Sequence, residues 1–350
     1  MTDPAVLRFP DGFLWGAATS SYQIEGAVEQ DGRGPSIWDT QCHQTELVRD
    51  RHTGDVAVDH YNRMPADVDM MAELGLQAYR FSVAWPRVQP TGTGPVNQPG
   101  LDFYSRLVDR LLEKGITPSL TLYHWDLPQA LEDAGGWPAR DTAYRFAEYA
   151  AIVFEALHDR VDMWATHNEP WCSTLLGYAD PSHAPGRTEP DAAIRSIHTL
   201  NLSHGLAVEA MRAIDPGPQQ GVVINLMPIH AVGDDPDGAA ADGARRYDGL
   251  RNRAFLEPML LGRYPDDVVE DVRAFGGLPV EEGDLQRVAQ PLDWFGLNYY
   301  TDDHVKAQKG GSWRATPGMK DAVPFAPDGE HTDMGWPITP DGLRAMLLDY

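Results

Sequence analysis

Short apolar segments that end in polar or aromatic residues alternate along this chain with longer segments of helical periodicity, and this alternation constrains the fold more than any other feature. The predicted strands are 13–18, 78–85, 118–123, 161–166, 221–227 and 294–299. Between them, segment 101–114 places its apolar residues on one face of a helix and ends before Gly115. Segments 141–160, with Asp141 as its cap, and 192–214 repeat the pattern. Strands and helices in regular succession predict an α/β fold with a parallel sheet.

A β/α barrel fits this succession better than a doubly wound open sheet. In the open-sheet fold the first strand should lead into a glycine-rich phosphate-binding loop, and the sequence contains neither GxGxxG nor GxxxxGK[ST]. Segments rich in Pro, Gly and Asp are predicted to be long loops, which in a barrel form the mouth of the active site. They are 90–100, 180–191, 231–245 and 305–330.

The charge and the cysteine content exclude several classes of function. The 350 residues include 52 acidic and 28 basic side chains, a formal net charge of -24, so neither nucleic acid nor an anionic membrane is an expected partner. Cys42 and Cys172 are too few for a disulfide framework or a cysteine-rich zinc site. The N-terminus has no leader pattern, and no stretch is long and apolar enough to cross a membrane. We therefore expect one cytoplasmic domain over residues 1–350.

Segment 166–172, Thr-His-Asn-Glu-Pro-Trp-Cys, follows the fourth predicted strand and contains the most informative polar residue of the chain, Glu169. A carboxyl group at the carboxyl end of a barrel strand is a candidate proton donor. The alternative is structural: Asn168 caps the next helix and Pro170 takes its first turn.

The other strand ends carry residues that suit a sugar ligand. Amides and imidazoles supply fixed donors and acceptors for hydroxyl groups, and indole rings stack on the C–H faces of a sugar. At these ends lie Ser21, Tyr22, Gln23 and Glu25, then Arg80, then His124 and Trp125, then Asn168 and Glu169, and finally Asn298 and Tyr300. In a barrel all of them face one mouth, which predicts a sugar-binding site.

Six segments, in order along the chain, resemble the motifs of glycoside hydrolase family 1, the β-glucosidase family. They are 9–26 (FPDGFLWGAATSSYQIEG), 79–87 (YRFSVAWPR), 123–128 (YHWDLP), 166–170 (THNEP), 297–300 (LNYY) and 333–336 (DMGW). The resemblance implies a (β/α)8 TIM barrel of which about the first six β/α units are present. It also implies a retaining β-glucosidase that hydrolyses terminal β-D-glucosyl residues of small β-glucosides or cello-oligosaccharides, without a metal or other cofactor.

The resemblance also implies roles for individual residues. Glu169 would be the general acid/base, Arg80 would lie beside the nucleophile and keep it ionised, and Trp336 would flank the leaving group. The sugar would be bound by Gln23, His124, Trp125, Asn168, Asn298 and Tyr300. A retaining glycosidase needs two carboxyl groups, one protonated to release the leaving group and one ionised to attack the anomeric carbon.

The second carboxyl group is where this chain departs from the family. The nucleophile of the family lies in an Ile/Val-Thr-Glu-Asn-Gly motif on strand seven, and the chain has no such motif. Its last residues, with Thr339 as a cap and Pro340 in the first helical position, predict the helix that follows strand six. We therefore expect a fragment without strands seven and eight, with exposed edges at strands one and six, and with little or no hydrolytic activity.

Several alternatives stay open at this point. Glu25, Asp126 and Asp302 lie near strand ends, but the family assigns the nucleophile to none of them. A chain without a nucleophile could be an inactive sugar-binding remnant or an interaction protein. A zinc hydrolase or deaminase is a third possibility because His167-x-Glu169 matches part of the His-x-Glu signature, but that site also needs a downstream Cys-x-x-Cys pair, which is absent. The other histidines, His43, His52 and His60, lack the spacing of metal ligands and are expected at the surface.

The sequence leaves open the oligomeric state and the choice among glucose, galactose, fucose and 6-phospho-sugars.

Overall fold

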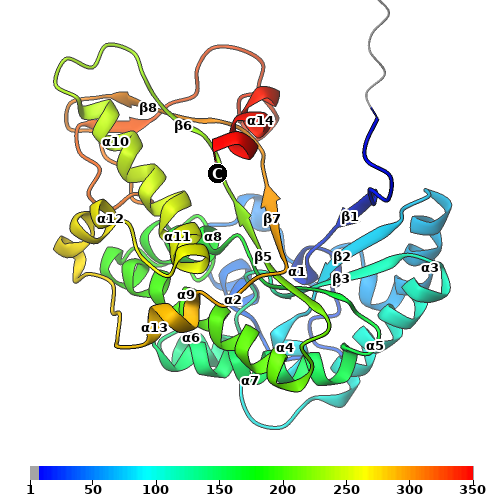
Figure 1. Ribbon diagram of the computed structural model, residues 1–350. Coiled ribbons are helices and arrows are strands. Elements are labelled where there is room, and N and C mark those ends of the chain that lie inside the picture. Colours follow the sequence, from blue (N-terminus) through cyan, green and yellow to red (C-terminus); the bar gives the residue numbers. More distant parts are fainter. Residues whose placement is uncertain (1–7, 350) are drawn as a thin grey trace, which may run out of the picture.

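The computed structural model describes residues 8–349, and its main element is a sheet of six parallel strands. The strands follow one another across the sheet in the order β1 (Gly16–Ala18), β2 (Ala78–Ser82), β3 (Thr117–Tyr123), β4 (Met163–Asn168), β5 (Gln219–Asn225) and β7 (Trp294–Asn298). Figure 1 labels β1, β2, β3, β5 and β7 of this sheet. The six predicted strands and the partial β/α barrel are confirmed. Segment 78–85 is shorter than predicted because Trp85–Val88 forms a helical turn, α4.

Four long helices lie along the sheet, each joined in sequence to a neighbouring strand. They are α3 (His60–Glu73), α5 (Gln98–Glu113), α7 (Asp141–Leu157) and α9 (Pro190–Ile214). Helix α5 ends as predicted, with Gly115 in the left-handed conformation at φ 72°. Asp141 is not the cap of α7. Arg140 takes that position and Asp141 is the first helical residue, where its carboxylate faces the positive end of the helix dipole.

Shorter elements build the loops between strands and helices. The α-helices are α1 (Ser21–Ile24), α2 (Ile37–Gln44), α6 (Gln129–Asp133), α8 (Pro170–Thr174), α10 (Ala239–Asp248), α11 (Ala254–Leu261), α12 (Asp266–Asp271), α13 (Asp284–Val288) and α14 (Pro340–Asp349). Segments Arg49–Arg51 and Arg273–Phe275 are 3-10 turns, and Leu175–Ala179 and Gly249–Arg253 are π-helical turns. Helix α14 begins at Pro340, as predicted.

Two of the predicted loops are wrong, because segments 231–245 and 305–330 contain part of a second sheet. This sheet has the order β6 (Ile229–Val232), β8 (Asp303–Ala307) and β9 (Ala322–Pro324), and it packs against α10. The strands are only three to five residues long, so local periodicity does not reveal them, whereas Val305 and Ala322 become fully buried in the folded chain. Figure 1 shows this sheet, α10 and α14 beyond the carboxyl ends of the main strands.

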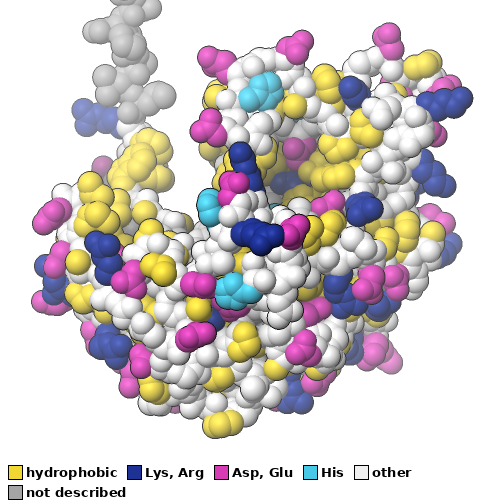
Figure 2. Space-filling view, turned by 180° about the vertical axis from the view of Figure 1, so that it is seen from behind, with side chains coloured by type: hydrophobic (Ala, Val, Ile, Leu, Met, Phe, Trp, Pro, Cys, Tyr) yellow, Lys and Arg dark blue, Asp and Glu magenta, His cyan; other side chains and the backbone are white. Residues whose placement is uncertain are grey.

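Both edges of the main sheet are open, as the sequence predicts. All three residues of β1 are exposed, and Phe295 in β7 is 37% exposed. Next to β1, Phe9, Phe13 and Trp15 form an exposed aromatic group with ring centroids 4.6–4.9 Å apart. Figure 2 shows hydrophobic side chains gathered beside the N-terminal segment. Unpaired edges of this kind are sites where further strands can pair.

Within the described residues, no helix is long and apolar enough to cross a membrane. Residues 1–7, where the sequence shows no leader pattern, lie outside the described residues.

Candidate active site

Glu169 occupies an unusual backbone position between β4 and α8. It is the N-terminal cap residue of α8, with φ 51° and ψ 66°, and Pro170 is the first residue of the helix. A left-handed conformation in a residue other than glycine costs on the order of 1–3 kcal/mol and persists where the surrounding structure enforces it. The structural alternative is therefore correct for Pro170 but not for Asn168, which does not cap the helix. The Glu169 side chain makes no capping hydrogen bond to the helix. The residue is nevertheless buried, with only 3% of its surface exposed.

The carboxylate of Glu169 accepts hydrogen bonds from three side chains. Its Oε1 accepts one from Nδ2 of Asn298 at 2.6 Å and one from the hydroxyl of Tyr300 at 3.0 Å. Its Oε2 accepts a bond from the thiol of Cys172 at 3.4 Å. Burial, with the charge of Glu169 added to it, raises the pKa of Tyr300 far above its ordinary value, so the phenol remains a donor. Strand β7 and the residues after it thus hold the carboxylate that β4 supplies.

Asn168 connects this carboxylate to the neighbouring strands. Its Oδ1 accepts hydrogen bonds from Arg80 at 3.0 Å and from Asn298 at 3.1 Å. With the oxygen so used, its Nδ2 must face Nε2 of His124, which lies at 3.3 Å. Its backbone oxygen accepts a bond from the indole of Trp125 at 2.8 Å. Residues of β2, β4 and β7, together with the end of β3, therefore meet at one amide.

The charges around Asn168 are set mainly by burial. Burial lowers the pKa of Arg80, and the nearby charge of Glu169 opposes that change. Burial likewise lowers the pKa of His124, to about 3, so its imidazole is neutral near pH 7. Because Nε2 of His124 accepts from Asn168, its proton lies on Nδ1, an atom without a hydrogen-bond partner among the described residues. That nitrogen is also buried from solvent.

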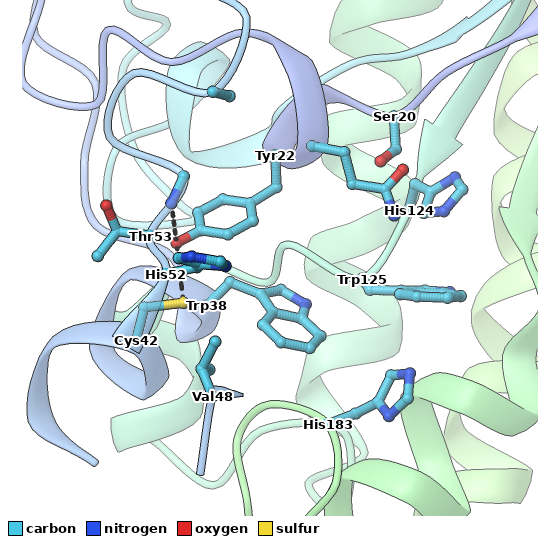
Figure 3. Close-up of a pocket in the computed structure, with 13 residues that line it drawn as sticks. Ser20, Tyr22, Trp38, Cys42, Val48, His52, Thr53, His124, Trp125 and His183 are labelled. Carbon is cyan, nitrogen blue, oxygen red and sulfur yellow. Dashed lines mark hydrogen bonds between the residues drawn. The ribbon is translucent and has the colours of Figure 1, made fainter. Parts of the chain in front are cut away.

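A pocket of about 410 Å³ lies beside this network. Its walls include Tyr22, Gln23, His124 and Trp125, together with two aromatic residues that the sequence analysis did not assign to the site, Trp38 and His183. Figure 3 shows these rings around the pocket. The centroid of His183 lies 5.3 Å from that of Trp125 and 5.7 Å from that of Trp38. Mostly apolar walls with a few polar groups are typical of small-molecule sites.

The structure brings together most of the residues that the sequence indicated. Arg80, His124, Trp125, Asn298 and Tyr300 contact Asn168 or Glu169 directly, as described above. Gln23 lines the same pocket as His124 and Trp125. The ring centroid of Trp336 lies 5.4 Å from that of Tyr300, and both side chains are partly exposed.

Sequence reasoning missed Trp38, Cys172, His183 and Asn225. Asn225 is the last residue of β5, so the rule that strand ends carry the site would have found it. Trp38 lies in helix α2, away from the strand ends, where no sequence signal marks it. His183 lies in segment 180–191, which was predicted as a loop at the mouth of the site, but nothing in the sequence singles out this residue within the loop.

The other carboxylates near strand ends have structural partners. Glu25 is buried and accepts hydrogen bonds from Arg87 at 3.0 Å and Tyr104 at 2.7 Å. Asp126 accepts one from Ser21 at 2.6 Å, and burial raises its pKa to about 7. Asp302 accepts one from Tyr299 at 2.7 Å.

The histidines give no support to a zinc enzyme. His167 is fully buried and bonds to Ser203 at 2.8 Å, and burial lowers its pKa well below the ordinary value. The prediction that His60 lies at the surface is wrong: it is 2% exposed and its Nδ1 contacts Asp67 at 2.7 Å. Among residues 8–349 there is no group of three or more His, Cys, Asp or Glu side chains arranged to hold a metal ion.

Comparison with known proteins gives close matches over almost the whole chain. The family described as "Glycosyl hydrolase family 1" matches residues 6–349. The thermostable β-glucosidase B of Thermobispora bispora is 49% identical over 344 residues, which are 98% of this chain and 69% of that protein. The crystal structure of a psychrophilic β-glucosidase from Micrococcus antarcticus has a TM-score of 0.91 and 46% identity, and the match covers 97% of this chain and 75% of that one. The β-glucosidase of Thermotoga maritima in complex with deoxynojirimycin has a TM-score of 0.89 and 42% identity, covering 98% of this chain and 75% of that one.

Proposed function

The chain belongs to glycosyl hydrolase family 1, and from this premise we propose that its site is the proton-donating, sugar-binding part of a retaining β-glucosidase. The substrates are terminal β-D-glucosyl residues of small β-glucosides or cello-oligosaccharides. One observation carries the proposal: Glu169 is buried at the end of β4, and donors from β7 and the residues after it hold its carboxyl group. A buried, oriented carboxyl group is what general acid catalysis of glycoside cleavage requires.

In this proposal Glu169 donates its proton to the glycosidic oxygen as the bond to the anomeric carbon breaks. Asn168, Gln23 and His124 bind the sugar hydroxyls, and Trp125 packs on the sugar ring. Asn298 and Tyr300 hold the carboxyl group, and Trp336 flanks the leaving group. Arg80, whose hydrogen-bond partner is a neutral amide, supplies positive charge beside the position where an anionic nucleophile would attack.

No carboxylate of residues 8–349 is assigned the nucleophilic role, because Glu25, Asp126 and Asp302 are held by other side chains. We therefore expect the 350-residue chain to cleave an aryl β-glucoside far more slowly than a complete retaining enzyme. A small anion should restore part of this rate. Azide attacks the anomeric carbon on the face opposite the leaving group, the bond between that carbon and the glycosidic oxygen breaks, and the aryl oxygen takes the proton of Glu169 and leaves as the phenol.

The experiment measures release of the phenol with and without azide, for the chain and for Glu169→Ala. Azide-dependent release with an α-glucosyl azide as the product supports the proposal, because a single displacement inverts the anomeric centre. For a poorly activated leaving group, Glu169→Ala should lower the azide-supported rate by about 10²–10⁴-fold. An ordinary rate without azide would show that the chain does contain a nucleophile, and would contradict this assignment.

A second function is favoured by the same lack of a second carboxylate: the chain could bind β-glucosides without cleaving them. In that case a glucoside should quench tryptophan fluorescence, Trp125→Ala should abolish the quenching, and azide should release no phenol. Trp294→Phe is a matched control, because Trp294 lies on the edge strand β7 and does not line the pocket.

A further inference from the structure

The two oxygens of the Glu169 carboxylate have unequal partners. Oε1 accepts from both Asn298 and Tyr300, whereas the described partner of Oε2 is the thiol of Cys172 at 3.4 Å. A carboxylate oxygen has two lone-pair sites, so two donors fill Oε1. The proton that an acid catalyst carries must therefore reside on Oε2, next to the sulfur.

A second side chain holds the sulfur in place. Cys172 lies in the first turn of α8 and is 5% exposed. Nδ2 of Asn225, at the end of β5, donates to its Sγ at 3.7 Å. Asn225 is paired in register with Asn298 of β7, the residue that holds Oε1. The two oxygens of Glu169 are thus controlled from two neighbouring strands, one directly and one through the thiol.

The electrostatic surroundings keep this thiol protonated. Burial raises the pKa of Cys172 well above its ordinary value, the charge of Glu169 raises it further, and the buried guanidinium of Arg251 opposes both effects. The other charged or titratable groups that face Glu169 are Arg80 of β2 and Tyr300. A thiol is a weak donor and its sulfur a weak acceptor.

We propose that Cys172, held by Asn225, is a positioning residue that directs Oε2 of Glu169 and stays in contact with it in both protonation states. When Glu169 is ionised, S–H donates to Oε2; when Oε2 carries the proton, O–H donates to the sulfur. Because both bonds are weak, the sulfur orients the oxygen without retaining the proton. This inference rests on the proposed role of Glu169 as acid/base.

The infrared S–H stretching band tests the contact directly. The chain has two cysteines, so a Cys42→Ser variant leaves the thiol of Cys172 alone, and Cys172→Ala assigns its band. In Glu169→Gln, Asn298 and Tyr300 still require an acceptor, so the amide oxygen faces them and the amide NH₂ faces the sulfur. We expect the band of Cys172 to lie at the lower frequency of a hydrogen-bonded thiol and to move up to the free-thiol position in Glu169→Gln.

The matched control is the band of Cys42 in the Cys172→Ala background, which should not move when Glu169→Gln is added. Cys42 instead accepts a bond from Tyr22 in the neighbouring pocket. A Cys172 band at the free-thiol position in the parent, or one that does not respond to Glu169→Gln in a folded variant, overturns the inference.

A functional readout separates this inference from the proposed function. Cys172→Ala should lower the azide-supported rate by about two- to fivefold at unchanged KM, the size expected for one weak hydrogen bond. If no azide-supported rate exists in the parent chain, the proposed function fails, and the infrared bands still decide whether the thiol holds Oε2. An unchanged azide-supported rate in Cys172→Ala would contradict the positioning role.

Discussion

The buried ion pair between Glu25 and Arg87 makes a strong prediction about stability, because Glu25 is one of the carboxylates near the site. Its side chain is 6% exposed and that of Arg87 is fully buried, with Nε–Oε2 at 3.0 Å. Tyr104 donates a second bond to Glu25 at 2.7 Å. Arg87 also donates to the backbone of Gly26 and lies over the ring of Tyr61. We infer that Glu25 neutralises Arg87 and is not free to attack a sugar.

Glu25→Ala removes two hydrogen bonds to a charged group, each contributing about 1.5–3 kcal/mol. It also leaves a buried guanidinium without its counter-charge. Breaking one partner of a buried pair costs about 3–5 kcal/mol, and the two estimates agree. We expect Glu25→Ala to lower the free energy of unfolding by about 3–5 kcal/mol, a large part of the roughly 5–15 kcal/mol that stabilises a typical domain.

Urea unfolding followed by tryptophan fluorescence measures this loss. Glu25→Leu combined with Arg87→Met should recover a large part of it, because no buried charge remains unpaired. Glu270→Ala is the control: its pair with Arg273 has side chains 65% and 72% exposed, and its loss should cost less than about 0.5 kcal/mol. A loss below about 1 kcal/mol in Glu25→Ala would refute the reasoning and return Glu25 to the list of possible nucleophiles.

Three further predictions concern the site and its supports. Asn168→Ala removes the acceptor shared by Arg80 and Asn298. It should lower the free energy of unfolding, measured by urea unfolding, by about 1–3 kcal/mol. It should also weaken glucoside binding, measured by fluorescence titration. Burial opposes ionisation of Asp284, but hydrogen bonds from Arg140 and His198 prevail and lower its pKa far below 3.8. The stabilisation that ionised Asp284 provides is complete above pH 3.8 and is lost as the pH falls through the pKa of the folded state. The difference in free energy of unfolding between the parent and Asp284→Asn should therefore shrink on acidification. A difference that stays constant with pH would contradict this prediction. Burial raises the pKa of Asp126 from 3.8 to about 7. Between these pH values the unfolded chain ionises Asp126 and the folded chain does not, so the free energy of unfolding should fall as the pH rises. Asp126→Asn should flatten that part of the curve of stability against pH.

The sequence predicted the main sheet and much of the site because both depend on local patterns and one geometric rule. The apolar segments 118–123 and 161–166 correspond to β3 and β4, each with bounds shifted by one or two residues. The carboxyl ends of parallel strands meet at one edge, so Arg80, Asn168 and Asn298 come together although they are far apart in the chain.

The remaining features depend on contacts that no local pattern contains. The strands β6, β8 and β9 are stable because Val305 and Ala322 are buried against α10. From the sequence, His60 was expected at the surface. In the structure it begins α3, packs against Phe103 and forms a hydrogen bond with Asp67. The contact between Cys172 and Oε2 of Glu169 depends on the rotamers of both side chains, which tertiary packing fixes.

The order of the strands in the main sheet has a consequence for how the chain is made. From β1 to β7, every strand of the sheet pairs with the strand of that sheet synthesised immediately before it. No pairing has to wait for a strand beyond the next one of the sheet, so each strand can join the growing sheet as the chain leaves the ribosome. Assembly then proceeds from the N-terminus outwards, and shortening the chain from its C-terminal end should remove strands one at a time while the earlier ones remain paired.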